Sequence, residues 1–247
     1  MLLSGKNAIV TGANRGIGRA IVEGFAQNGA CIWAHARKET AEFLADMAAI
    51  AERHGSVIRP VFFDVTDRSA MKAGVRQIAS SARPIDVLVN NAGVAHGGLF
   101  QMTSIDTIRQ IFEVNFFSVL EFSQPIVRLM QKNKNGSIIN IASRSGLDLK
   151  SGNIAYGVSK AALLAATKTL AAELGASGIR VNAIAAGLTD TDMAKQMEDK
   201  ARRNMVENTS LKRLARPKEI ADVAVFLASD MASFVTGHVL CADGGSI

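Results

Sequence analysis

A single tyrosine and the lysine four residues after it are the residues whose types and spacing most clearly suggest chemistry. Tyr156 is the only tyrosine among 247 residues, and Lys160 follows it in the segment AYGVSK. In a helix these two positions share one face. A nearby ammonium stabilises a phenolate, so we expect Lys160 to lower the pKa of Tyr156. Such a phenol can exchange a proton with a carbonyl or alcohol oxygen. The alternative is a structural tyrosine in an ordinary helix pair.

Two further polar residues stand where a site is expected. Ser143 ends the strand-like segment GSIINIAS, and its hydroxyl is a candidate hydrogen-bond partner for a substrate oxygen. The alternative for Ser143 is a turn or N-cap serine. Asn115 falls on the apolar stripe of a predicted helix. A buried amide is costly unless it is hydrogen-bonded, so Asn115 either serves the site or is a core asparagine bonded to backbone or water.

A glycine-rich segment near the N-terminus could hold phosphates. TGANRGIG, residues 11–18, follows a strand-like segment and opens a helix. Gly12, Gly16 and Gly18 would allow a tight turn and a close approach of a pyrophosphate to the helix N-terminus. Their spacing is G-x3-G-x-G rather than G-x-G-x-x-G. The prediction of a phosphate-binding loop therefore depends on the place of this segment, directly after the first predicted strand.

The residues after the second predicted strand favour NADP over NAD. An acidic residue at this point would bond a ribose 2′-hydroxyl, whereas a basic one suits a 2′-phosphate. Arg37 and Lys38 follow the strand in WAHARKE, and Arg15 lies in the glycine loop. Glu39 is assigned to the next helix. The alternative is that Arg37 is a solvated surface residue.

Strand-like and helix-like segments alternate along the chain, and these elements must position the residues named above. Strands are predicted at 7–12, 30–35, 56–65, 85–93, 136–143, 179–187 and 237–245, and helices at 17–27, 39–55, 67–82, 104–132, 154–175, 190–208 and 217–229. This alternation predicts the α/β class: a single Rossmann-type doubly wound domain over residues 1–247, with a seven-stranded, mainly parallel sheet and helices on both faces. Ligands bind beyond the carboxyl ends of such strands.

Composition narrows the partners. The net charge is +6, and 48% of the residues are hydrophobic but only 5% are aromatic. Because the cations are scattered and stacking platforms are missing, we expect no nucleic acid partner. No apolar run is long enough to span a membrane, and no signal-peptide layout is present, so we expect a cytoplasmic protein. Cys31 and Cys241 have no metal-ligand spacing. We expect buried free thiols and no metal.

Together these motifs resemble the short-chain dehydrogenase/reductase family in its compact single-domain branch. The resemblance runs from Gly5 to Gly245 and rests on TGANRGIG, NNAG at 90–93, Asn115, Ser143 and YGVSK. It is strongest to 3-oxoacyl-[acyl-carrier-protein] reductases. It implies an NADPH-dependent enzyme that interconverts a ketone and a secondary alcohol by hydride transfer.

The resemblance also implies roles for individual residues. Tyr156 would be the general acid–base, and Lys160 would lower its pKa and bind the nicotinamide ribose. Ser143 would orient the carbonyl, and Asn115 would hold a water of a proton relay. The implied cofactor contacts are Gly12, Asn14, Arg15, Gly16, Ile17, Gly18, Arg37, Asp64, Val65, Asn91, Ala92, Gly93, Tyr156, Lys160, Gly187, Leu188, Thr189 and Thr191, and the implied substrate contacts are Ser143, Ser145 and Tyr156.

The substrate is less well defined than the reaction. Variable segments 94–102, 144–153 and 190–208 would shape the pocket, with a lid at about 188–210. The family usually has proline where Ala186 stands, and its absence is expected to loosen this loop modestly. A 3-oxoacyl thioester is the leading substrate, while sugars, polyols, steroids and small ketones remain open.

Partners and alternatives follow from the same resemblance. Basic residues could dock an acidic carrier protein or form a solvated face: Arg128, Lys132, Lys134, Arg202 and Arg203. The family often assembles as a homotetramer through the helices at 104–132 and 154–175 and the last strand. A non-catalytic NADP-binding module is the alternative function. An epimerase or dehydratase is a third, since those enzymes share the tyrosine–lysine pair but usually carry an extra C-terminal region.

Overall fold

The computed structural model describes residues 1–81, 83–195 and 197–246. A parallel sheet lies at its centre, and the first strand of the chain lies in the middle of that sheet. The strands are β1 Asn7–Val10, β2 Cys31–Ala36, β3 Ile58–Phe62, β4 Val87–Asn90, β5 Gly136–Ile141, β6 Ile179–Ala186 and β7 Val239–Ala242. Their order is β3-β2-β1-β4-β5-β6-β7, and all neighbouring pairs are parallel. This doubly wound order confirms the predicted α/β class.

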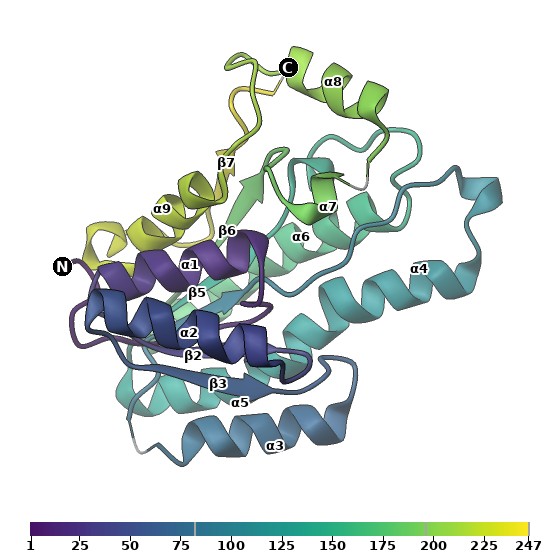
Figure 1. Cartoon of the computed structure of the whole chain (residues 1–247). Coiled ribbons are helices and arrows are strands. Elements are labelled where there is room, and N and C mark those ends of the chain that lie inside the picture. The colour runs from purple at the N-terminus through teal and green to yellow at the C-terminus, as the bar shows by residue number, and fades with distance from the viewer. Residues whose placement is uncertain (82, 196, 247) are drawn as a thin grey trace.

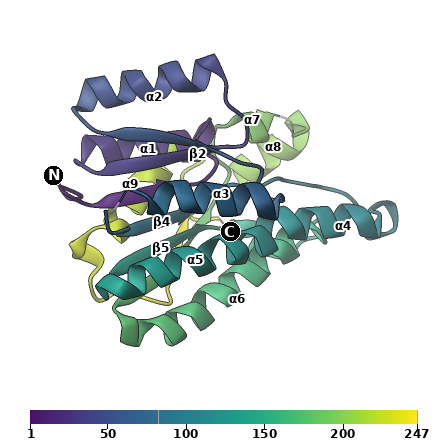
Figure 2. The same ribbon diagram turned by 90° about the horizontal axis from the view of Figure 1, so that it is seen from below.

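Helices cover both faces of this sheet. One face carries α1 (Gly16–Gln27), α2 (Ala41–His54) and α9 (Pro217–Ala228), and the other carries α3 (Arg68–Ala79), α5 (Ser118–Asn133) and α6 (Tyr156–Leu174) (Figures 1 and 2). Each face has its own apolar cluster, one around Phe25 and one around Phe122. β1, β4 and β5 are buried along their whole length, and this explains why their sequences are nearly continuous apolar runs.

Side-chain caps fix where two helices begin. Thr40 precedes α2, and its hydroxyl accepts a hydrogen bond from the Phe43 amide at 3.2 Å. The assignment of Glu39 to that helix is therefore wrong, because Glu39 lies before the cap. Asp67 caps α3 by accepting from the Ser69 amide at 2.8 Å. The predicted end of that helix, Ala82, lies outside the described residues.

The predicted helix at 104–132 is interrupted. It consists of α4 (Ile105–Phe112), a π-helical segment at Glu113–Phe117, and α5. Such π-turns are frequent at functional sites. In Figures 1 and 2, α4 projects from the sheet. The region 190–208 is likewise divided, into α7 (Asp192–Lys195) and α8 (Asp199–Glu207), and Gln196 between them lies outside the described residues.

The expectation of two buried thiols is wrong. Cys31 at the start of β2 is partly exposed, and Cys241 in β7 is exposed, because β7 is one of the two edge strands of the sheet. Both cysteines are free. Among the helices of residues 1–81, 83–195 and 197–246, none combines the length and the apolar character needed to cross a membrane.

Candidate active site

Three of the predicted catalytic residues meet beyond the carboxyl end of β5. Ser143 follows this strand by two residues, and Tyr156 is the first residue of α6. The Ser143 hydroxyl lies near enough to the Tyr156 phenol to oppose the effect of burial on its pKa. Lys160, one turn further along α6, is buried, and its Nζ donates a hydrogen bond to the Ile141 carbonyl at 2.9 Å. The strand end and the helix start therefore bring a hydroxyl, a phenol and an ammonium together.

The pKa of Tyr156 is shifted in the direction opposite to the one expected from its spacing to Lys160. Burial raises the pKa of Tyr156, and the interaction with Ser143 only partly opposes this shift. Lys160 Nζ lies 6.0 Å from the Tyr156 ring centroid and is turned toward the Ile141 carbonyl. Burial also lowers the pKa of Lys160, to about 8. In this geometry burial, rather than the ammonium, sets the pKa of the phenol.

Asn115 sits in the π-helical segment and is completely buried. Its Oδ1 accepts from the Val94 amide at 2.9 Å, and its Nδ2 donates to the Val94 carbonyl at 2.9 Å and to Ser159 Oγ at 3.1 Å. The side chain thus ties the loop after β4 to α6. Bonding to a water would use the remaining lone pair of Oδ1, so the relay role stays a prediction.

Gly93 lies close to both Asn115 and Lys160. A Cβ atom built on Gly93 would lie 3.2 Å from Asn115 Oδ1 and 3.4 Å from Lys160 Nζ. A side chain at position 93 would therefore pack tightly against these two polar groups. This geometry agrees with the predicted position of Gly93 in a cofactor trough.

The glycine loop has the geometry of a phosphate cradle. Gly12 and Gly16 have φ angles of +65° and +56°, which favour glycine. A Cβ on Gly18 would lie 2.1 Å from the Gly12 carbonyl oxygen, so no other residue fits there. α1 begins at Gly16 with no side-chain cap and no acidic residue in its first turn. Its first amides are therefore suited to an anion, and the loop fits a dinucleotide pyrophosphate.

Thr11 holds the glycine loop against the NNAG segment. Its hydroxyl accepts from the amides of Asn91, at 2.9 Å, and Ala92, at 3.0 Å. Asn91 Nδ2 in turn donates to the carbonyls of Thr11, at 2.9 Å, and Gly12, at 3.0 Å. Sequence reasoning missed the roles of Thr11 and Ser159, although both stand inside motifs that it used. Their hydroxyls in otherwise buried segments were the available signal.

The residues predicted near the adenosine lie at the ends of β2 and β3. Arg37 is exposed after β2. Asp64, after β3, accepts from the amide and the hydroxyl of Thr66 at 2.9 and 2.7 Å. These bonds lower the pKa of Asp64, and the nearby Arg37 guanidinium adds to the shift. Arg15 Nη1 lies 3.4 Å from an Asp192 carboxylate oxygen, which links the glycine loop to α7.

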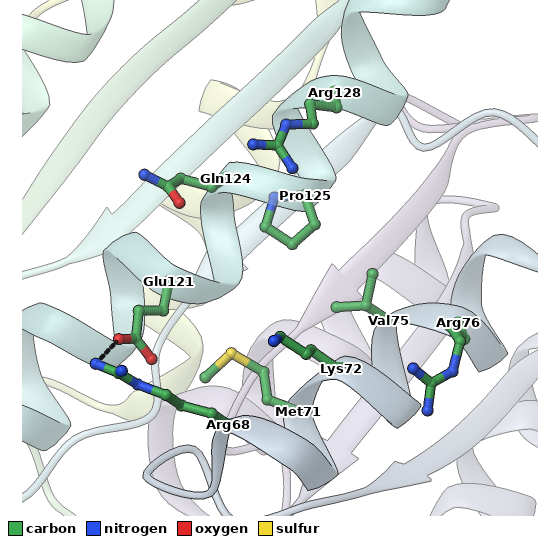
Figure 3. A pocket seen from close by; sticks show the side chains of 9 residues that line it. All are labelled: Arg68, Met71, Lys72, Val75, Arg76, Glu121, Gln124, Pro125 and Arg128. Atoms are coloured by element: carbon green, nitrogen blue, oxygen red, sulfur yellow. Dashed lines mark ion pairs between the residues drawn. The ribbon is translucent and has the colours of Figure 1, made fainter.

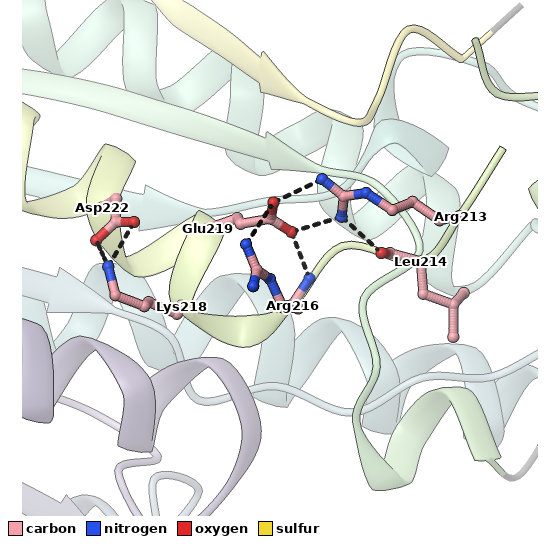
Figure 4. Close-up of polar contacts among 6 residues, drawn as sticks. All are labelled: Arg213, Leu214, Arg216, Lys218, Glu219 and Asp222. Carbon is pink, nitrogen blue, oxygen red and sulfur yellow. Dashed lines mark hydrogen bonds and ion pairs between the residues drawn. The ribbon is translucent and has the colours of Figure 1, made fainter. Parts of the chain in front are cut away.

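The chain before and after the segment predicted as a lid pairs through its backbone. Leu188 accepts from the Ala215 amide at 3.0 Å, and the Asp190 amide donates back to the Ala215 carbonyl at 2.8 Å. Just beyond, Glu219 accepts from the Arg216 amide at 2.7 Å and pairs with Arg213, also at 2.7 Å (Figure 4). These bonds anchor the end of the excursion that contains α7 and α8.

The residues predicted to contact the cofactor at 187–191 follow the end of β6. A Cβ on Gly187 would lie 2.6 Å from Asp243 Cα, so close packing requires the glycine. Thr189 is buried, and its hydroxyl donates to the Gly187 carbonyl at 3.0 Å. Thr191 lies against the glycine loop, with its Cγ2 3.1 Å from a Cβ built on Gly16. Thr191 therefore brings the end of this segment against the glycine loop.

Two of the variable segments lie side by side next to Tyr156. The Gly98 amide donates to the Gly152 carbonyl at 2.9 Å. Ser145 donates through its amide to Ser143 Oγ at 3.1 Å. Exposed apolar side chains line these two segments and their flanks, namely Val94, Leu99, Phe100, Met102, Leu147, Leu149 and Ile154. Apolar side chains are therefore exposed on the segments that flank the start of α6.

A groove of about 430 Å³ lies between α3 and α5, apart from the residues described so far (Figure 3). It is lined by Arg68, Met71, Lys72, Val75, Arg76, Glu121, Gln124, Pro125 and Arg128. Of the basic residues predicted for carrier docking, Arg128 lies here. Arg202 instead pairs with Asp199 at 2.8 Å. Within the part of the chain that the structure describes, no cluster of histidine, cysteine and acidic side chains could hold a metal ion.

Comparison with known proteins gives consistent results. Residues 12–246 match the family described as enoyl-(acyl carrier protein) reductase. The chain is 38% identical, over 100% of both chains, to the 3-oxoacyl-[acyl-carrier-protein] reductase FabG of Thermotoga maritima. It is 36% identical to the FabG of Escherichia coli, over 99% of this chain and 98% of that one. A mutant short-chain dehydrogenase/reductase of Serratia marcescens superposes with a TM-score of 0.92 at 32% identity, covering 99% of each chain.

The doubly wound sheet and the matched relatives define an oxidoreductase that acts on CH–OH and C=O groups with a nicotinamide cofactor. The chain belongs to the short-chain dehydrogenase/reductase family.

Proposed function

We propose that this enzyme reduces 3-oxoacyl thioesters with NADPH, with Tyr156 as the general acid. The observation that carries the proposal is the meeting of Ser143, Tyr156 and Lys160 at the end of β5. Two relatives named 3-oxoacyl-[acyl-carrier-protein] reductase match the chain over nearly its whole length. A non-catalytic binding module would have no need for this set of side chains.

Each side chain has a part in the proposed reaction. When bound, a nicotinamide cofactor would supply the hydride that the carbonyl carbon accepts. Ser143 orients the carbonyl oxygen, and Tyr156 protonates it. The raised pKa of Tyr156 keeps the phenol protonated at neutral pH, which is the state a reduction requires. Lys160 is mainly charged below its pKa of about 8, and we assign its buried ammonium to the nicotinamide ribose.

Charge at the adenosine end supports the proposed preference for NADPH. Arg37 and Arg15 are exposed beside the proposed cofactor path, and a guanidinium suits a phosphate in a bidentate way. Glu39 is exposed and precedes the cap of α2. Asp64 engages one carboxylate oxygen with Thr66 and leaves the other for the adenine. We therefore assign Arg37 to the 2′-phosphate.

The apolar surface next to Tyr156 supports an acyl substrate. Leu147 and Leu149 are exposed beside α6, and Met193 and Met205 are exposed on α7 and α8. Methionine side chains adapt to chains of different length. We propose that residues 188–210 form a lid over the acyl chain within a single domain, that an acidic carrier protein delivers the substrate, and that the enzyme is cytoplasmic and tetrameric.

The test is the initial rate of NADPH oxidation with an acetoacetyl thioester. We expect turnover with NADPH and at least about tenfold less with NADH, because one lost phosphate–arginine contact has this effect. A crotonyl thioester is the matched control, since it carries a C=C bond in place of the ketone. Turnover of the crotonyl ester alone would reassign the enzyme as an enoyl reductase. Turnover of neither, with NADPH still bound, would remove the thioester substrate.

A further inference from the structure

A buried histidine occupies the end of β2, where the sheet meets the glycine loop. His35 is 2% exposed, and its ring stacks on Phe63 with 4.0 Å between the centroids. The surrounding β2 residues are apolar, so a ring with two polar nitrogens must find partners for both. It was not among the residues that the sequence motifs singled out.

Both ring nitrogens are engaged, and their partners belong to different parts of the cofactor region. Nδ1 lies 3.2 Å from the Gly12 amide, and Nε2 lies 2.8 Å from the Phe63 carbonyl oxygen. An amide can only donate and a carbonyl can only accept. The ring must therefore carry its proton on Nε2 and accept on Nδ1. Burial lowers the pKa of His35 to about 4, which keeps this neutral form at neutral pH.

The backbone of His35 strengthens the same connection. Its carbonyl accepts a hydrogen bond from the Ala13 amide at 2.8 Å. His35 therefore accepts hydrogen bonds from the amides of two consecutive residues of the glycine loop, Gly12 and Ala13. Phe63, the partner on the other side, immediately precedes Asp64. His35 thus joins the loop that would hold the pyrophosphate to the strand end that would hold the adenine.

We propose that His35 is a positioning residue that fixes the Gly12 turn of the glycine loop for dinucleotide binding. The proposal rests on the proposed cofactor site but not on the identity of the substrate. The side chain acts through Gly12 and Phe63 and does not contact the reacting atoms. Removing its acceptor would take away one of the bonds that hold the turn, and binding would then have to restore the ordered conformation.

Two amide variants separate the contacts of the ring. In His35→Asn the side-chain oxygen stands near the place of Nδ1 and can accept from the Gly12 amide. In His35→Gln the longer side chain reaches toward the Phe63 carbonyl instead. His35→Phe keeps the ring and removes both nitrogens. If the Gly12 bond is what matters, the asparagine variant retains function and the glutamine variant does not.

The first readout is hydrogen exchange of the Gly12 amide in the cofactor-free protein, followed by NMR. We expect exchange to be about tenfold faster in His35→Gln than in wild type, the size of one lost hydrogen bond, and near wild type in His35→Asn. Equal exchange in both variants would overturn the proposal. This readout needs neither substrate nor turnover, so it stands even if the proposed reaction is wrong.

The second readout is the binding of NADPH and NADH by fluorescence titration. We expect His35→Gln to weaken both cofactors about tenfold, with kcat at saturating cofactor changed less than about twofold. An Arg37→Ser variant should instead weaken NADPH alone. A loss of kcat with unchanged cofactor affinity would contradict the positioning role. If His35→Phe does not fold, the asparagine and glutamine pair still decides the question.

Discussion

The phenol of Tyr156 is the single group whose removal should stop the proposed reaction. It lies against Ser143 at the start of α6, and burial keeps it protonated. We expect Tyr156→Phe to lower kcat by at least about 100-fold, because general acids contribute 10²–10⁴-fold. Cofactor affinity should stay within about twofold, since the ring remains. The measurement is kcat together with NADPH titration, and retention of a tenth of the activity would remove Tyr156 from this role.

The charge of Lys160 should appear in the pH profile. Burial lowers the pKa of this ammonium to about 8, so it is charged below that pH and loses its proton above it. We expect kcat/KM for reduction to fall as the pH rises through about 8. In Lys160→Arg the charge persists to high pH, so this inflection should vanish even if the rate is low. A wild-type rate that is constant up to pH 10 would contradict the prediction.

At the scale of elements, the turn between β1 and α1 makes the sharpest steric demand. A Cβ on Gly18 would lie 2.1 Å from the Gly12 carbonyl oxygen, whereas a Cβ on Gly24 of the same helix would meet the Val225 side chain at an ordinary 3.5 Å. We expect Gly18→Ala to weaken NADPH binding more than tenfold, since the backbone of the cradle must shift. The measurement is cofactor titration with a thermal unfolding curve.

Gly24→Ala is the matched control for this helix. Alanine favours a helix interior over glycine by about 0.5–1 kcal/mol, so the variant should be as stable as wild type or more stable. Its affinity for NADPH should not change. If both variants lost affinity equally, the effect would belong to α1 as a whole and not to the cradle.

The alternation of elements could be predicted because a parallel sheet buried on both faces leaves continuous apolar strands. The interruption at Asn115 could not, because the periodicity of a π-turn differs from that of an α-helix by a single residue. That turn is stabilised by a tertiary contact, the pair of bonds between Asn115 and Val94. The cap at Thr40 was readable in principle, but the acidic residue before it obscured the boundary.

Within the site, the side chains that could do chemistry were predictable from the sequence, but the contacts that each of them makes were not. Ser143, Tyr156 and Lys160 were named in advance, and the structure places them together. The direction of the Tyr156 pKa shift was not predictable, because it depends on burial and on where Lys160 Nζ points. His35 was missed because its role arises from two partners that are distant in sequence, Gly12 and Phe63.

At the scale of the whole molecule, α6 carries Tyr156 and Lys160 and also provides the proposed interface between subunits. Its inward face carries Lys160 and the apolar core, while Ala165, Thr169 and Ala172 are exposed on its outer face. Small side chains let two helices approach closely. The edge strand β7 is also open to a partner, with Cys241 exposed on it. We therefore expect light scattering to give a mass about four times 26.2 kDa.

Ala165→Arg should disrupt this assembly, because a long charged side chain would separate the helices. The same change at Ala49, which is exposed on α2 and outside the proposed interface, is the matched control. We expect only Ala165→Arg to give a smaller mass by light scattering and a lower Tm. Subunit association stabilises the folded chain in a concentration-dependent way, so its loss lowers the Tm. A monomeric wild type, or equal mass for both variants, would exclude α6 as the interface. The outer face of α6 would then be an ordinary solvated surface, and the positions of Tyr156 and Lys160 would depend on packing within one chain alone.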